Sequence, residues 1–358
     1  MKNPFGEPLH LSKRVYRLNK PPISVSAVSK VSKYKYANRQ SLQKKLSLPQ
    51  ITTMSEAQTT IVKIGTRGSK LALWQAHFLQ AQLKKLSYKS ELTIIKTKGD
   101  RIQHLSFDKM EGKGFFTKEI EDSLLRGDVD LAVHSMKDLP TTSPEGLAIS
   151  GVSYRANPAD WMLIRKEAVV EGADLFLSEG ALVGTSSARR KAQLLDFRPD
   201  LKMSDIRGNV PTRIRKLQEG NFDAILLAAA GLERLEIDLS DLKVIRFHPK
   251  EFVPAPAQGV LAFQTRKDDI PTRRIVKQLH DSDVAEKTNV ERTILKLLDG
   301  GCQLPMGAYC EKDGDGNYHI WAAMAKSWDG ELTKVQMSSS TSHQLAERVV
   351  EQLLGKKS

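Results

Sequence analysis

Short apolar runs alternate with segments of helical period from residue 61 onward, and this alternation restricts the fold more than any other feature. Residues 61–66 (IVKIGT) predict a strand, and the amphipathic segment 69–86 predicts the helix that follows it. The pattern continues with three further elements: a strand over 91–100, a helix over 117–127 that Thr117 caps and Gly127 ends, and a buried strand over 129–136. Strands that alternate with helices in this way indicate an α/β architecture.

Two pairs of segments resemble each other at a distance and indicate an internal repeat. VKIGTRGSKLALWQ (62–75) is similar to ALVGTSSARRKAQLL (181–195), and LLRGDVDLAVHS (124–135) is similar to LQEGNFDAILLA (217–228). Both members of the first pair consist of a strand, a Gly-Thr turn and a helix. Both members of the second pair consist of the end of a helix, a Gly, an Asp and a strand. The repeat therefore predicts two related α/β lobes with a cleft between them.

The chain is expected to cross between these lobes twice, near 154–160 and near 251–259, where Pro254 and Pro256 stiffen the second connection. From about residue 281, a helical segment leads into short strands separated by Asp-Gly turns, which is typical of a small α+β domain. The predicted domains are 59–154 with 257–278, 155–256, and 279–358.

The net charge of +13 is unevenly distributed along the 358 residues. Residues 1–54 hold eleven Lys and Arg against one acidic residue, which leaves 44 basic and 41 acidic residues in the remainder. The basic extension 1–58 is Ser-rich and has no helical period, so we interpret it as disordered, or as sequence upstream of a misassigned start with Met54 the initiator. A cleaved organellar transit peptide shares this composition and is the alternative.

Composition and spacing argue against several classes of protein. No apolar run approaches about 18 residues, so no transmembrane helix is expected. The two cysteines do not suggest a disulfide framework and favour a reducing compartment. No His, Cys, Asp and Glu spacing resembles a metal site, and neither a Walker loop nor a GxGxxG loop is present. We therefore expect no metal and no nucleotide.

Basic and hydroxyl side chains gather where predicted strands end or helices begin. A helix N-terminus presents unpaired amides, and Arg adds a planar fork that binds a carboxylate with two hydrogen bonds. Taken singly, each Arg is equally well explained as a solvated surface charge. The repetition in both lobes predicts a cleft for a polyanion, formed by four segments: Thr66–Ser69, Thr185–Arg190, Arg207–Asn209 with Arg213, and Lys109 with Gly112–Gly114.

The segment VHSMKDLP (133–140) follows a predicted strand, at the edge of an α/β sheet where ligands bind. Ser135, Lys137 and Asp138 would lie there, and an ionised Asp138 among cations could stabilise a developing positive charge or transfer a proton. Spacing alone favours Asp138 slightly more as a turn residue before Leu139. His134 is interpreted as a packed strand histidine.

The segment LLDGGCQLPMG (297–307) contains Cys302. By spacing it predicts the end of a helix followed by a turn, with a small buried cysteine in a structural role. Cys310 is interpreted as an inert strand residue.

Eight motifs, taken together and in order, resemble the porphobilinogen deaminase family. They are GTRGSKLALWQA, GKGFFTKEIEDSLL, DLAVHSMKDLPT, GTSSARRKAQLL, RGNVPTRIRKL, DAILLAAAGLERL, PAPAQG and GGCQLPMGAY. The resemblance runs from about residue 61 to the C-terminus. It implies a three-domain fold whose first two domains are similar to periplasmic binding proteins.

The resemblance also implies a dipyrromethane cofactor, built from two porphobilinogen units and attached by a thioether at the position of Cys302. Asp138 matches the catalytic aspartate, which assists the loss of ammonia and stabilises cationic intermediates. Lys109 and Lys113 fall in or beside the active-site lid, and Gln258 is assigned with them to substrate binding. The residues matched to cofactor binding are Arg67, Ser69, Ser135, Lys137, Thr185, Ser187, Arg189, Arg190, Arg207, Gly208 and Arg213.

The leading hypothesis is a transferase that condenses four porphobilinogen molecules head to tail into hydroxymethylbilane, releasing ammonia, on a primer linked to Cys302. We expect a cytoplasmic monomer that binds this small anionic substrate and neither nucleic acid nor membrane. A plastid location is the alternative if 1–54 is a transit peptide. Two other hypotheses are a bilobal anion-binding protein without catalysis, which leaves Cys302 and Asp138 without a role, and a nucleic-acid binder, which would rest on the charge of the extension.

Overall fold

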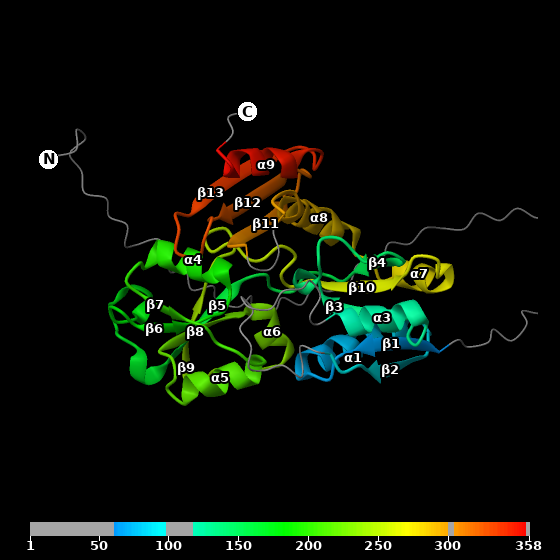
Figure 1. The fold of residues 1–358 in the computed structure, drawn as a ribbon, viewed down its shortest axis with the longest axis horizontal. Helices are drawn as coiled ribbons and strands as arrows, with labels where there is room; N and C mark the ends of the chain where they lie inside the picture. The colour runs from blue at the N-terminus through cyan, green and yellow to red at the C-terminus, as the bar shows by residue number, and fades with distance from the viewer. Residues whose placement is uncertain (1–60, 98–116, 300–303, 356–358) are drawn as a thin grey trace, which may run out of the picture. The chain divides into compact units, whose positions relative to one another are not determined.

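The structure is a computed structural model, and it describes residues 61–97, 117–299 and 304–355 (Figure 1). In these residues the chain forms two five-stranded sheets and one three-stranded sheet. The mixed α/β class predicted from the sequence is confirmed. The basic extension 1–58, Lys109 and Lys113, and Cys302 lie outside the described residues.

The first sheet contains β10, which reaches it from a distant part of the sequence. β1 pairs in parallel with β2 and β3, whereas β10 runs antiparallel to both β3 and β4. Ile64, Leu131 and Phe263 form its core with Leu79 and Leu83 of helix α1. The strand order is β2 (Ser90–Ile94), β1 (Val62–Thr66), β3 (Leu131–Ser135), β10 (Leu261–Arg266) and β4 (Leu147–Val152). The helices of this lobe are α1 (Lys70–Lys85), α3 (Lys118–Arg126) and α7 (Ile270–Lys277).

The second sheet follows the same plan. β6 pairs in parallel with β7 and β8, and β5 runs antiparallel to β8 and β9. Its buried faces carry Met162, Val183, Ile225 and Leu226. The strand order is β7 (Lys202–Ser204), β6 (Leu182–Gly184), β8 (Ala224–Ala228), β5 (Asp160–Arg165) and β9 (Leu242–Arg246). The helices are α4 (Ala188–Phe197), α5 (Val210–Gln218) and α6 (Ala229–Arg234), with short 3-10 turns η3 (Lys166–Ala168) and η4 (Asp174–Phe176).

The predicted internal repeat is present in the two sheets. In each lobe one strand, β1 or β6, pairs with two parallel neighbours, and an antiparallel strand follows on the far side of the second neighbour. Gly127 and Gly220 stand at equivalent places with φ of 79° and 83°, a left-handed conformation that glycine adopts without strain. The sequence similarity noted between the two halves therefore reflects a shared fold.

A small antiparallel sheet forms the C-terminal α+β domain, as predicted. Its strands are β11 (Met306–Lys312), β12 (Tyr318–Met324) and β13 (Thr333–Ser339). Helices α8 (Ser282–Leu297) and α9 (Leu345–Leu353) pack beside each other and cover the sheet (Figure 1). Ile294 and Val349 from these helices meet Cys310 and Ile320 from the strands in one core.

Three expectations about element boundaries need correction. β2 ends at Ile94, well before residue 100, because the chain leaves the sheet where β1 also ends. Thr117 precedes α3 but donates its hydroxyl to Glu121 Oε2 at 3.2 Å, so it provides no side-chain cap. β3 ends at Ser135, and the 3-10 turn η2 (Met136–Asp138) follows. Among the described residues, no helix combines the length and the hydropathy needed to cross a bilayer.

Candidate active site

Each lobe carries a capped helix directly after the strand that has two parallel neighbours, α1 after β1 and α4 after β6. Ser69 begins α1 and accepts a hydrogen bond from the Ala72 amide at 3.3 Å. Ser187 begins α4 and accepts one from the Arg190 amide at 3.5 Å. A serine that accepts through its oxygen retains a hydroxyl proton for an anionic ligand. Thr185 is buried, and its hydroxyl accepts from the Ser187 amide at 3.3 Å, so it shapes this turn from within.

The turn after β3 holds the candidate acid. Asp138 is exposed, and within the described part of the chain its carboxylate makes no hydrogen bond or ion pair. Lys137 Nζ donates to Gln258 Oε1 at 3.2 Å. Ser135 accepts from Gln75 Nε2 at 2.9 Å. The turn therefore presents a carboxylate outward while its neighbours are fixed to the protein.

The ammonium group of Lys137 titrates unusually low. The pKa of this group is lowered to about 8: burial is the main cause, Arg190 and Arg189 also lower the pKa, and Asp138 and Asp160 act in the opposite direction. Burial disfavours the charged form of a lysine, and nearby cations disfavour it as well. Lys137 can therefore exist in both protonation states close to neutral pH, which suits a group that transfers protons.

Asp160 is the residue that organises this region, and the sequence reasoning missed it. It is fully buried at the start of β5, where it accepts from Arg189 NH1 at 2.7 Å and Arg190 NH2 at 2.6 Å. Gln258 Nε2 also donates to it at 3.0 Å. Burial alone would raise the pKa of this carboxyl, but the two guanidinium groups hold it well below its usual range. The available signal was an acid at the start of the apolar segment 160–164, next to the predicted connection between the lobes.

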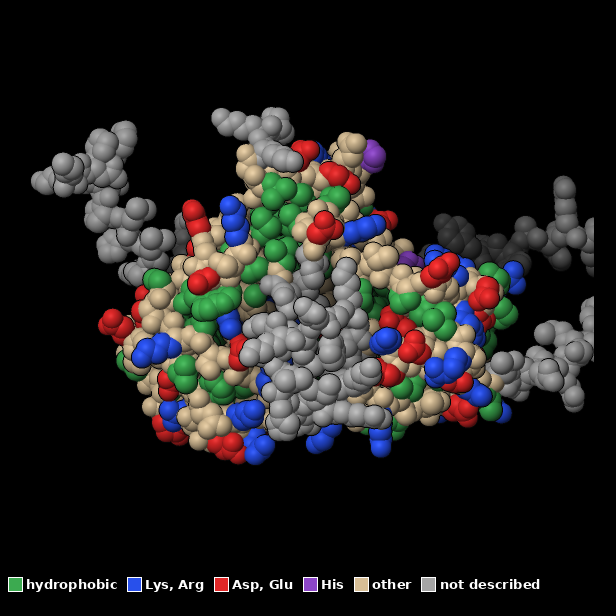
Figure 2. Space-filling view, in the orientation of Figure 1, with side chains coloured by type: hydrophobic (Ala, Val, Ile, Leu, Met, Phe, Trp, Pro, Cys, Tyr) green, Lys and Arg blue, Asp and Glu red, His purple; other side chains and the backbone are tan. Residues whose placement is uncertain are grey.

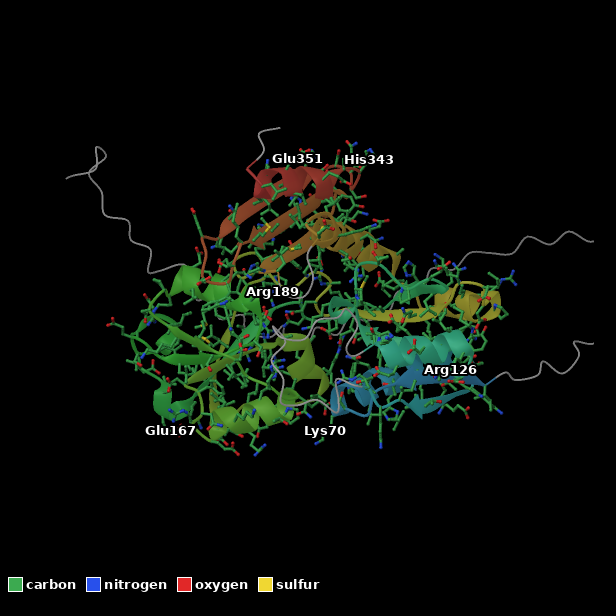
Figure 3. The ribbon with its side chains drawn as sticks, in the orientation of Figure 1. Lys70, Arg126, Glu167, Arg189, His343 and Glu351 are labelled. Carbon is green, nitrogen blue, oxygen red and sulfur yellow. The ribbon has the colours of Figure 1, made fainter. Side chains whose placement is uncertain are left out.

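Arg189 and Arg190 are both buried, and their side chains make further contacts with the protein. Arg189 NH1 donates to the Val253 carbonyl at 2.9 Å, and Arg190 NH1 donates to the Leu226 carbonyl at 3.0 Å. Figure 3 labels Arg189 near the middle of the view, well apart from Arg126 at the end of α3. Two guanidinium groups share one carboxylate here, so the cluster keeps an excess of positive charge.

The loop after β7 adds further cations. Arg213, in the first turns of α5, donates through Nε to the Gly208 carbonyl at 2.7 Å. The pKa of its guanidinium group is lowered to about 10: burial is the main cause, Arg190 and Arg207 also lower the pKa, and Asp138 opposes the shift. Arg213 of the second lobe is therefore influenced by the charge of Asp138 in the first lobe. Gly208 has a φ of 111°, and an added Cβ would lie 2.6 Å from Thr212, so the turn requires glycine.

Arg67 follows β1 and influences His134 on the neighbouring strand. The pKa of His134 is lowered to about 4: burial is the main cause, a hydrogen bond with Gln264 opposes it, and Arg67 adds a smaller lowering. His134 is therefore a neutral packed histidine, as the sequence predicted. Cys310 is also buried as predicted, and burial raises the pKa of its thiol to about 12.

The predicted residues fall into two groups. Gln258 links Lys137 to Asp160 and so to Arg189 and Arg190, and the charges of Asp138, Arg207 and Arg213 act on this cluster. Arg67, Ser69, Thr185 and Ser187 lie at the strand ends of the two lobes. Within the described ranges, no group of three or more His, Cys, Asp or Glu side chains could hold a metal ion.

The visible surface contrasts with this buried cluster. Figure 2 shows one face on which the Lys and Arg side chains lie among Asp and Glu side chains, outside the grey atoms. Arg189 and Arg190, by contrast, are buried and share the single carboxylate of Asp160.

Comparison with known proteins agrees with these features. Residues 62–274 match the family model described as porphobilinogen deaminase, dipyromethane cofactor binding domain, and 285–355 match its C-terminal domain. The chain is 48% identical over 255 residues to the porphobilinogen deaminase of Oceanobacillus iheyensis, covering 70% of this chain and 81% of that protein. It is 41% identical over 299 residues to that of Streptococcus sanguinis, covering 83% and 96%.

A solved periplasmic substrate-binding protein of an ABC transporter from Coxiella burnetii is 14% identical. It covers 63% of this chain and 94% of its own, with a TM-score of 0.39. The sequence relatives are far more similar, and the two family models together match most of the chain from residue 62 onward. The chain belongs to the porphobilinogen deaminase family.

Proposed function

We propose that this chain condenses four porphobilinogen molecules head to tail, releases one ammonia with each, and forms hydroxymethylbilane when water cleaves the bond between the finished chain and its primer. Family membership supports the reaction, and one observation in the structure supports the site. The outward carboxylate of Asp138 is held on a turn whose neighbouring Lys137 joins a cluster of buried cations from the second lobe. This arrangement suits a substrate that is anionic at its periphery and becomes cationic at its reacting carbon.

A dipyrromethane cofactor fits the residues present. Its carboxylates need several cations and hydroxyl donors, and the cluster has two guanidinium groups for one internal carboxylate. When bound, we propose through a thioether to Cys302, the cofactor supplies the pyrrole from which the product chain grows. The residues that would hold it are Arg67, Ser69, Ser135, Lys137, Thr185, Ser187, Arg189, Arg190, Arg207, Gly208 and Arg213.

Asp138 is proposed to be the catalytic residue. In each condensation the C–N bond of the aminomethyl group breaks, a C–C bond forms at the same carbon, the accepting pyrrole carbon loses a proton, and nitrogen leaves as ammonia. Positive charge develops on the substrate as the amine leaves, and a fixed carboxylate beside it lowers the energy of that state. The same carboxylate can take up the proton that is lost.

Lys137 is proposed to donate a proton to the leaving amine. Its pKa of about 8 makes the ammonium form a better proton donor than an ordinary lysine. Gln258 accepts a hydrogen bond from this ammonium group and holds it, and Lys137 and Asp138 do not form a direct ion pair. Lys109 and Lys113 are proposed to belong to the lid over this site.

The test of the cofactor assignment is the intact mass of three purified proteins: the wild type, Cys302→Ser and Cys310→Ser. We expect a covalent dipyrrole on the wild type and on Cys310→Ser, since Cys310 is buried in the C-terminal core, and none on Cys302→Ser. An unmodified wild type from a host that makes porphobilinogen would contradict the proposal.

We also propose that the enzyme is a cytoplasmic monomer whose partner is porphobilinogen. A plastid location remains the alternative if 1–54 is a transit peptide. The proposed domains are 59–154 with 257–278, 155–256 and 279–358, and the membership of the strands in the three sheets supports them. Sedimentation of the purified protein tests the monomer, and N-terminal sequencing of the native protein tests the extension.

A further inference from the structure

Helix α8 of the C-terminal domain reaches the turn that carries Asp138. The Arg292 side chain is buried, and its NH1 donates to the carbonyls of Met136 at 3.0 Å and Leu139 at 3.2 Å. Its NH2 donates to the carbonyl of Pro140 at 2.6 Å. One guanidinium group therefore holds three carbonyls of a five-residue segment that contains both Lys137 and Asp138.

This segment has little secondary structure to fix its position. The turn η2 is closed by a single backbone hydrogen bond, from the Leu139 amide to the Met136 carbonyl at 3.3 Å. Pro140 has no amide proton and cannot add another. Buried carbonyls require donors, and the rigid fork of an arginine fixes the relative position of the atoms that it binds. The Met136 amide donates to the Val260 carbonyl at 2.9 Å and fixes where the turn begins, and Arg292 fixes the carbonyls of Met136, Leu139 and Pro140.

The residue before Arg292 anchors the same helix to the rest of the site. Glu291 is fully buried and accepts from Arg155 NH1 at 2.6 Å and from the amides of Ala257 at 2.7 Å and Cys310 at 2.8 Å. Ala257 has a φ of 61°, a strained conformation for an alanine that surrounding contacts must hold in place.

The next residue is Gln258, whose side chain accepts from Lys137. Neighbouring residues of α8 therefore reach the turn by two routes. Arg292 binds its backbone directly, and Glu291 fixes the segment whose side chain binds Lys137.

We propose that Arg292 is a positioning residue for catalysis, through which the C-terminal domain orients Asp138 and Lys137 of the first lobe. This inference rests on the proposed role of Asp138. Helix α8 ends at Leu297, only five residues before Cys302 in the sequence. The helix that fixes the backbone of the proposed catalytic turn therefore also precedes, in the sequence, the cysteine proposed to carry the cofactor.

The first test compares the activity of Arg292→Gln, Arg292→Lys and Arg266→Gln. Arg266 is a matched control, because its NH1 also donates to two backbone carbonyls, those of Leu124 and Val129, in a part of the first lobe remote from the turn. We expect Arg292→Gln to lower kcat about 100-fold with little change in KM, because misplacement of a catalytic group by an ångström has such an effect. Arg292→Lys should recover part of the loss, and Arg266→Gln should keep the wild-type kcat per folded molecule. Intact mass must first show equal cofactor loading.

The second test does not depend on activity. Hydrogen exchange measured on a peptide spanning 136–142 should be at least about tenfold faster in Arg292→Gln than in the wild type, and unchanged in Arg266→Gln. A wild type without deaminase activity would contradict the proposed function. The hydrogen-exchange measurement would still show whether Arg292 fixes the turn. Wild-type exchange in folded Arg292→Gln would overturn the inference. A kcat near that of the wild type, or equal losses of kcat in Arg292→Gln and Arg266→Gln, would also overturn it.

Discussion

Asp130 in the first lobe and Asp223 in the second hold their sheets together in the same way. Asp130 Oδ2 accepts from the Lys63 amide at 3.0 Å, and Asp223 Oδ2 accepts from the Leu182 amide at 2.8 Å. Each also pairs at 3.2 Å with an arginine from the end of the antiparallel strand, Arg266 for Asp130 and Arg165 for Asp223. The joint that holds the parallel strands is thus the same in both lobes.

The lobes differ at the opposite end of the same strands. β3 runs into Ser135, Lys137 and Asp138, whereas β8 runs into the buried alanines at the start of α6. The capped helices α1 and α4 differ in the opposite sense. The first turn of α4 in the second lobe has the buried Arg189 and Arg190, whereas α1 in the first lobe begins with the exposed Lys70. The first lobe therefore provides the acid and the second provides the buried cations. A repeated scaffold has acquired different chemistry at one end only.

The largest expected effect follows from removal of the acid of the first lobe. Asp138→Asn should lower kcat about 10³-fold, since this substitution removes both charge stabilisation and a proton acceptor. Stability should hardly change, because Asp138 is exposed. The control is Asp241→Asn, an exposed acid of the second lobe paired with Lys166. The measurement is the steady-state kcat of both variants. A near-normal kcat for Asp138→Asn would contradict the proposed difference between the lobes.

The next effect concerns the cations of the second lobe. Asp160→Asn leaves Arg189 and Arg190 buried without their shared carboxylate, which should lower the free energy of unfolding by about 3–5 kcal/mol. Asp223→Asn, in the joint that both lobes share, removes a partly exposed partner and should lower the free energy of unfolding less. Denaturant titration compares the two, and equal losses would show that Asp160 is no more important than the common joint.

A smaller effect is expected from the protonation of Lys137. With a pKa of about 8, its ammonium form is lost as the pH rises through that value, so kcat should fall on the alkaline side. Lys137→Arg keeps its charge at every accessible pH, so its profile should remain flat there even if its maximum is lower. The pH dependence of kcat tests this expectation, and an unchanged alkaline decline in Lys137→Arg would assign the titration to another group.

The smallest effects should be equal in the two lobes. Gly127 and Gly220 adopt left-handed φ values, and an added Cβ would have no atom within 4 Å in either place. Gly127→Ala and Gly220→Ala should therefore each lower the free energy of unfolding by about 1 kcal/mol through backbone strain alone, and leave kcat unchanged. Thermal unfolding provides the measurement. Clearly unequal losses would mean that these two turns are not equivalent.

Much of the fold could be predicted from the sequence because its signals are local. Apolar periodicity, the cap residues Ser69 and Ser187, and the helix-ending Gly127 each act within one or two turns of chain. The position of Asp138 after a buried strand was also a local signal. Even so, β2 was predicted too long and Thr117 was wrongly expected to cap α3 with its side chain.

The residues that the sequence did not reveal depend on partners far away in the chain. Asp160 binds an arginine 29 residues later, and Arg292 binds a carbonyl 156 residues earlier. Glu291 joins three separate segments. No periodicity or spacing shows such contacts, because each depends on how the lobes and the C-terminal domain pack against one another.

The most direct test of the account is to measure ammonia and hydroxymethylbilane together, with saturating porphobilinogen, for the cofactor-loaded wild type and Asp138→Asn. The account predicts four ammonia molecules for each hydroxymethylbilane in the wild type, and a rate about 10³-fold lower for both products in Asp138→Asn. A wild type that binds porphobilinogen without releasing ammonia, or an Asp138→Asn enzyme that forms both products at the wild-type rate, would contradict it.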